Sequence, residues 1–159
     1  MVTLPDFPVA GGCQCGAVRY ALKGPPLAVY NCHCKDCQRL SGGTHTMSMV
    51  VNRELLQLTE GKLHPHEKVA ESGRIAVMML CRECGSLLWN EPLSAPELRI
   101  LKPGTLDDMS WAVPVGNIWT ASRAPFAAID ETLINFEGQP PGREVFFPAW
   151  AALTGAKPQ

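Results

Sequence analysis

The chain has 159 residues, a formal net charge of −1, 46% hydrophobic residues and 18% charged residues. This length predicts a single domain, and the composition is that of a globular protein rather than a disordered chain. The near-neutral charge argues against a nucleic-acid partner, because such domains normally carry a basic face.

We expect a cytoplasmic protein without a membrane partner. The N-terminal stretch "MVTLPDFPVAGG" lacks the charged and then apolar regions of a signal peptide. The longest apolar run, "IAVMML", is too short to span a bilayer. In a reducing compartment, the seven cysteines are more typical of metal ligands or reactive thiols than of disulfides.

In chain order, the sequence predicts a mainly β fold with few short helices. The first strand shows the period-two pattern of a half-buried strand at Val18, Tyr20 and Leu22. Strands are predicted at residues 17–22, 46–52, 55–59, 73–80, 86–90, 98–102 and 126–130. The segment 73–80 is apolar enough to be buried on both faces. Short helices are predicted at 37–41 and 148–155, and 14 prolines and 14 glycines indicate many turns between the elements.

Four cysteines form two spaced pairs, Cys13 with Cys15 and Cys81 with Cys84. Residues two apart in extended backbone point the same way, so the first pair can reach one ion. "CRECG" resembles a zinc knuckle, in which Gly85 can take a positive φ and turn backbone N–H groups toward the thiolates. The two pairs together predict a structural zinc site. Two alternatives are reduced buried thiol pairs and a redox-active C-x-x-C motif.

The remaining cysteines, Cys32, Cys34 and Cys37, form a C-x-C-x-x-C cluster in "NCHCKDCQR". Three protein ligands with an open fourth position are typical of catalytic zinc. Three thiolates give the zinc centre a formal charge of −1, which favours holding a substrate thiolate over hydrolysis.

Other interpretations of this cluster stay open. His33, His45 or a carboxylate could close the site, the cysteines could be paired differently, or the cluster could be free of metal. His33 alternates with two ligands in extended backbone, so we expect it to point away from the metal. The "HPH" stretch at 64–66 is expected in an exposed loop. The tryptophans are expected in the core or lining a groove: Trp89, Trp111, Trp119 and Trp150.

Together, "GGCQCGAVRY", "NCHCKDCQRLSGG" and "CRECGSLLW" resemble the glutathione-dependent formaldehyde-activating enzyme family, also known as Gfa-like or centromere-protein-V-like. "KPGTLDD" and "IWTASRAPF" resemble the second half of that family. The match covers about residues 11–137, which leaves 138–159 as a C-terminal extension of the single domain 1–159. The sequence departs from common family residues at Leu80, His66 and Asn117.

The resemblance implies an Mss4-like (β-tent) fold of small antiparallel sheets and two zinc ions per chain. One would be structural, on Cys13, Cys15, Cys81 and Cys84; the other would be catalytic, on Cys32, Cys34 and Cys37. It also implies a carbon–sulfur lyase that joins glutathione and formaldehyde, or a related small aldehyde, to S-hydroxymethylglutathione.

Lys35 and Arg39 are candidate contacts for the glutathione carboxylates because they lie near the cluster in sequence, although both could instead form a solvated face. His45 or water is a candidate proton donor. The alternative functions are a glutathione carrier without turnover and a zinc-stabilised protein-binding module. The sequence does not indicate an oligomeric state.

Overall fold

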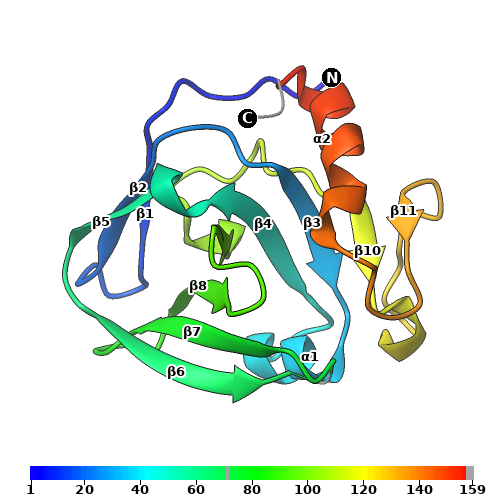
Figure 1. The fold of residues 1–159 in the computed structure, drawn as a ribbon, viewed down its shortest axis with the longest axis horizontal. Coiled ribbons are helices and arrows are strands. Elements are labelled where there is room, and N and C mark those ends of the chain that lie inside the picture. Colours follow the sequence, from blue (N-terminus) through cyan, green and yellow to red (C-terminus); the bar gives the residue numbers. More distant parts are fainter. Residues whose placement is uncertain (71, 157–159) are drawn as a thin grey trace.

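The computed structural model describes residues 1–70 and 72–156 (Figure 1). The strands are β1 (Val9–Gly12), β2 (Arg19–Leu22), β3 (Ala28–Cys32), β4 (Thr46–Asn52), β5 (Leu56–Glu60), β6 (Leu63–Val69), β7 (Ile75–Cys81), β8 (Leu87–Pro92), β9 (Leu98–Leu101), β10 (Gly116–Ile118) and β11 (Ile134–Asn135). The α-helices are α1 (Lys35–Ser41) and α2 (Phe147–Thr154). Short 3₁₀ helices are η1 (Arg53–Leu55), η2 (Pro103–Thr105), η3 (Thr120–Ser122) and η4 (Arg143–Phe146). The predicted mainly β class with few short helices is confirmed.

The strands form two sheets. One has three antiparallel strands in the order β1-β2-β5, and the other has eight in the order β11-β10-β3-β4-β9-β8-β7-β6. The larger sheet is mixed, because β10 pairs in parallel with both β3 and β11. This sheet twists strongly: β3 and β4 run steeply and antiparallel to each other in Figure 1, whereas β6 and β7 cross beneath them. The twist brings the β6–β7 hairpin close to α1.

Most predicted strands are confirmed, and the segment 46–52 coincides with β4. The strand predicted at 126–130 is wrong: this segment is irregular, and its Phe126 is 83% exposed. Its apolar residues have no neighbouring strand to pair with. Conversely, the "HPH" stretch lies in β6 rather than in a loop, although its side chains are exposed. Because β6 is the last strand of its sheet, Pro65 removes no hydrogen bond that an inner strand would need.

The segment predicted to be buried on both faces, now β7, is only partly buried along most of its length. Met78 lines a cavity on one side of the strand, and Met79 lines a separate cleft. The long apolar run therefore reflects a strand between two hollows rather than a strand inside the core.

The C-terminal segment packs against the strand that carries Cys32. Helix α2 contacts β3, and its Trp150 is buried. Phe146 stacks on Tyr30 of β3 with 5.0 Å between ring centroids. The backbone N–H of Val2 donates to the carbonyl of Leu153 at 2.9 Å, so both ends of the described chain meet beside α2 (Figure 1). Neither α-helix within residues 1–70 and 72–156 is long and apolar enough to cross a membrane.

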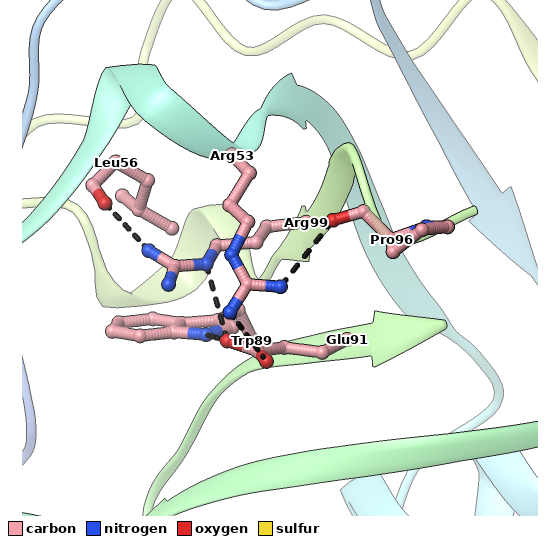
Figure 2. Close-up of polar contacts among 6 residues, drawn as sticks. All are labelled: Arg53, Leu56, Trp89, Glu91, Pro96 and Arg99. Carbon is pink, nitrogen blue, oxygen red and sulfur yellow. Dashed lines mark hydrogen bonds and ion pairs between the residues drawn. The ribbon is translucent and has the colours of Figure 1, made fainter. Parts of the chain in front are cut away.

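Arg99 of β9 links the two sheets, as Figure 2 shows. Its Nη1 donates to the carbonyl of Leu56 in β5 at 2.6 Å, and its Nε lies 3.1 Å from Glu91 Oε1. The guanidinium also lies over the Trp89 ring, 5.1 Å from its centroid. Trp89 Nε1 donates to the same Glu91 oxygen at 3.1 Å, and Arg53 lies 3.5 Å from the other oxygen. Glu91 therefore offsets the charge of a largely buried arginine.

Candidate functional site

The first candidate site is the four-cysteine cluster of Cys13, Cys15, Cys81 and Cys84, whose sulfur atoms all lie within 4.8 Å of one another. Cys15 Sγ lies 3.5 Å from Cys13 Sγ and 3.8 Å from Cys81 Sγ. The predicted pairing of these cysteines in space is therefore present, and the cluster could hold a metal ion. Because it joins the turn after β1 to the end of β7, it links segments that are distant in sequence.

Two tight turns present these sulfur atoms. In the second turn, the N–H of Gly85 donates to the Cys81 carbonyl at 2.9 Å, and Gly85 has the expected positive φ of 73°. The Ser86 hydroxyl lies 3.1 Å from Cys84 Sγ. Hydrogen bonds from Ser86 lower the pKa of Cys84 to about 5, so this thiol is readily deprotonated, as a metal ligand must be. In the first turn, the N–H of Val18 donates to Cys13 Sγ at 3.2 Å.

The second candidate site is the three-cysteine cluster of Cys32, Cys34 and Cys37, again with all sulfur atoms within 4.8 Å of one another. Cys32 ends β3, Cys34 is the N-cap of α1, and Cys37 lies in the first turn of that helix. The Cys34 sulfur accepts the Cys37 backbone N–H at 3.4 Å, in the manner of a capping side chain. The short helix therefore folds the C-x-x-C segment back onto the end of the strand.

Without a metal ion, one negative charge shared among the three thiols is more favourable than a separate charge on each of them. Hydrogen bonds from Cys32 and, to a lesser extent, from Cys34 lower the pKa of Cys37 to about 2. The nearby charge of Lys102 acts in the same direction. The pKa of Cys32 is raised well above its usual value, because it would ionise beside hydrogen-bonded Cys34 and Cys37. A cation among the sulfur atoms would allow all three thiols to ionise, which is how metal binding releases protons from cysteine sites.

A cavity of about 150 Å³ opens beside the three-cysteine cluster, and all three of these cysteines line it. No residue of the four-cysteine cluster does so. Apolar side chains from the larger sheet form much of the wall, including Ile75, Met78, Ile100 and Ile118. Trp119 also lines this wall, as expected, and has an unusual positive φ of 61°. The other three tryptophans are buried in the core.

His33 points away from the cluster, as predicted from its position between two cysteines. The residue is buried, and its Nε2 lies 3.2 Å from Asn117 Oδ1. Asn117 in turn donates to Asn135 Oδ1 at 2.8 Å, which joins β10 to β11. The His45 ring lies beside the His33 ring at an interplanar angle of 37°, with 5.0 Å between ring centroids. Burial lowers the pKa of His45, and His45 does not line the cavity.

Neither basic residue proposed from sequence proximity lines the cavity. Lys35 Nζ donates to the Ser122 carbonyl at 3.0 Å and to Gln38 Oε1 at 3.2 Å. Arg39 is exposed on α1. The basic side chains along the wall come instead from distant segments: Lys68, Arg74, Lys102 and Arg143. Arg74 and Lys102 lie in predicted strands, but nothing in the sequence marked any of the four as a cavity residue. The departures at Leu80, His66 and Asn117 all lie outside the lining.

Comparisons with known proteins agree with this fold and these clusters. The model of the glutathione-dependent formaldehyde-activating enzyme family matches residues 8–122, which include all seven cysteines. A crystal structure of a Rhodobacter sphaeroides protein superimposes with a TM-score of 0.51 at 17% sequence identity, covering 80% of this chain and 98% of that one. That likeness shows a shared fold. No curated protein sequence matches the chain.

The family match spans most of the chain, and the mainly β fold brings the matched cysteines into two clusters that could each hold a metal ion. The chain therefore belongs to the glutathione-dependent formaldehyde-activating enzyme family, which associates it with glutathione and formaldehyde.

Proposed function

We propose that the protein is a zinc-dependent carbon–sulfur lyase of the S-hydroxymethylglutathione synthase type. A small thiol, glutathione in the first instance, would bind beside the three-cysteine cluster and add to formaldehyde or a related small aldehyde. The four-cysteine cluster would hold a structural zinc. We place the enzyme in the cytoplasm and treat 1–159 as one domain.

One observation carries this proposal: the cluster with three sulfur ligands lines a cavity, and the cluster with four does not. A tetrahedral ion bound by three cysteines keeps one position for another ligand, whereas four cysteines complete the shell. The ligand count and the access to the cavity therefore both favour a substrate site at Cys32, Cys34 and Cys37.

The donor sets fit zinc. Zinc–sulfur bonds of about 2.3 Å in a tetrahedron place the sulfur atoms about 3.8 Å apart. In the four-cysteine cluster, the measured separations of 3.5 and 3.8 Å are close to that value. When bound to the three-cysteine cluster, zinc would supply a positive charge that keeps a substrate thiol in its nucleophilic thiolate form.

The chain's own groups would orient the reactants and limit access of water. The apolar wall at Ile100 and Ile118 suits a small aldehyde and limits the access of water. In the reaction, the thiol sulfur forms a bond to the carbonyl carbon, the C=O π electrons move to oxygen, and a proton equivalent to the one lost by the thiol neutralises the alkoxide. Nothing is oxidised or reduced. Water in the open cavity is our proposed proton donor, because His45 does not line the cavity.

Metal analysis of matched variants tests the assignment. Wild-type protein should contain about two zinc ions per chain. Cys34→Ser should stay folded, retain about one zinc and lose glutathione binding. Cys81→Ser, its counterpart in the other cluster, should lose stability, because the structural site contributes directly to folding. If Cys34→Ser unfolds and loses both metals while Cys81→Ser does neither, the two roles are assigned wrongly.

Turnover separates an enzyme from a carrier. The rate of S-hydroxymethylglutathione formation, followed by NMR exchange at equilibrium, should rise in proportion to wild-type protein and not to Cys34→Ser. A protein that binds glutathione tightly without changing this rate would be a carrier.

A further inference from the structure

The cavity beside the three-cysteine cluster has a basic lining, and part of its charge lacks an acidic partner. Of its four cations, Lys68 pairs with Asp36 at 2.9 Å. Lys102 lies close enough to the three thiols for their charges to raise its pKa, against the larger lowering caused by burial. Arg74 and Arg143 are different: among the residues that the structure describes, neither forms an ion pair.

Arg143 is the more constrained of these two arginines. It lies in η4, packed beside β3, and its Nε is buried without a hydrogen-bond partner. Arg143 and Tyr30 both line the cavity. Tyr30 precedes Cys32 by two residues in the same strand, so both side chains point to the same face. Arg143 is therefore held on the cavity side of β3, near the sulfur atoms.

A buried guanidinium N–H without an acceptor is costly, and such groups in native proteins usually have a partner. An anion that enters the cavity would supply this acceptor. Carboxylate is the natural candidate, because its two oxygens match the planar N–H fork of arginine.

Arg74 approaches the same cavity from another direction. It precedes β7, near one end of the eight-stranded sheet, whereas Arg143 follows β10 and β11 at the other end. Both residues line the cavity because the sheet curves around it. Apolar residues such as Ile75 and Ile118 also line the wall. Besides Lys68 and Lys102, the cavity thus presents two arginines that form no ion pair with any described residue, with apolar side chains also along its wall.

We infer that Arg74 and Arg143 select the thiol substrate by binding its carboxylates, one at each wall of the cavity. This inference rests on the proposed function, in which the thiol sulfur lies at the three-cysteine cluster. Glutathione carries two carboxylates, and formaldehyde carries none, so these arginines act on the thiol alone. Arg74 lies within the family-matched residues 8–122, whereas Arg143 lies beyond them, so the C-terminal extension would supply one of the two contacts.

Binding to cobalt(II)-substituted protein tests the inference without relying on turnover. Thiolate coordination changes the cobalt absorption spectrum, so titrations with glutathione and with neutral 2-mercaptoethanol report both affinities. Arg143→Gln and Arg74→Gln should each weaken glutathione about tenfold to a hundredfold, the range expected for a charge-assisted hydrogen bond. Both variants should bind 2-mercaptoethanol within about twofold of wild type. Lys23→Gln, an exposed cation outside the cavity, is the control for net charge.

Three results would overturn the inference. Glutathione affinity could stay within about twofold in both variants, or affinity could fall equally for glutathione and 2-mercaptoethanol, which would indicate a distorted site. A loss of glutathione affinity in Arg39→Gln but not in Arg143→Gln would overturn it in favour of the contact suggested by sequence proximity.

S-methylglutathione separates this inference from the proposed function, because it keeps both carboxylates but has no thiol. If no thiol changes the cobalt spectrum of wild type, the proposed function fails. Carboxylate recognition is then judged by calorimetry with S-methylglutathione, which should bind wild type and lose affinity in Arg143→Gln. Equal binding to the two proteins would refute the role of Arg143.

Discussion

Replacing Glu91 with glutamine should destabilise the protein by about 2–4 kcal/mol. Glu91 Oε1 lies 3.1 Å from both Arg99 Nε and Trp89 Nε1, and the Arg99 and Glu91 side chains are only 16% and 19% exposed (Figure 2). Glutamine keeps the shape but removes the charge beside Arg99 and leaves Trp89 with a neutral amide in place of a carboxylate. Together these losses cost about 1.5–3 kcal/mol, the range for hydrogen bonds to charged groups. Losing the half-exposed Arg53 contact adds less than about 1 kcal/mol.

Urea unfolding at fixed zinc saturation measures this loss, with the midpoint falling and the slope unchanged. For a chain of this size, the melting temperature should fall by roughly 2–4 °C for each kcal/mol. Glu54→Gln is the control. Like Glu91, this exposed carboxylate lines the cleft beside Met79, and its loss should change stability by no more than about 0.5 kcal/mol. A Glu91→Gln loss below about 1 kcal/mol would show that Arg99 does not depend on this carboxylate.

Three further predictions concern other parts of the fold. Trp150→Ala should lower the free energy of unfolding by about 3–5 kcal/mol in one cooperative transition. Trp150→Phe should cost less, because phenylalanine keeps an aromatic ring and removes a buried indole N–H that has no partner. Gly61→Ala should lower stability by at least about 1–2 kcal/mol, measured by thermal unfolding, because φ is +81° and the new Cβ would lie 2.1 Å from a backbone oxygen. Its control, Gly104→Ala, has open space around the new Cβ and should be nearly neutral. Arg19 lowers the pKa of Asp107, so their ion pair stabilises the protein above pH about 4 and is lost as pH falls through the folded pKa. Asp107→Asn should therefore remove less than about 1 kcal/mol at pH 7, because the pair is exposed, and less still near pH 2.

Local patterns predicted strands that alternate in burial and strands that are buried at several consecutive positions. The alternation at 17–22 marks β2, and the apolar segment 46–52 marks β4 in the middle of the larger sheet. The pattern failed where burial depends on distant neighbours. Residues 126–130 have strand-like composition but no partner strand, whereas β6 has a polar composition and pairs with β7 along its whole length.

The same division holds at the candidate site. The number and spacing of the seven cysteines predicted both clusters, and the position of His33 between two of them predicted that it would point away. Within each motif, spacing is sufficient because residues two or three apart in a strand or turn have a fixed relative direction. The joining of the two cysteine pairs was predicted from their number and not from spacing. Proximity in sequence suggested Lys35 and Arg39 as glutathione contacts, but neither side chain lines the cavity.

By itself, the sequence determined the mainly β class, the three-cysteine cluster, the two spaced cysteine pairs and the family, because each depends on local periodicity or short spacing. The meeting of the two pairs in one four-cysteine cluster depends on the fold, since Cys15 and Cys81 are 66 residues apart. Only the tertiary structure decided which cluster faces a cavity and which cations line it. Arg74 and Arg143 are 69 residues apart in sequence. Both line the cavity because the twisted eight-stranded sheet curves around it. No local pattern encodes that curvature, which arises from the summed twist of many paired strands.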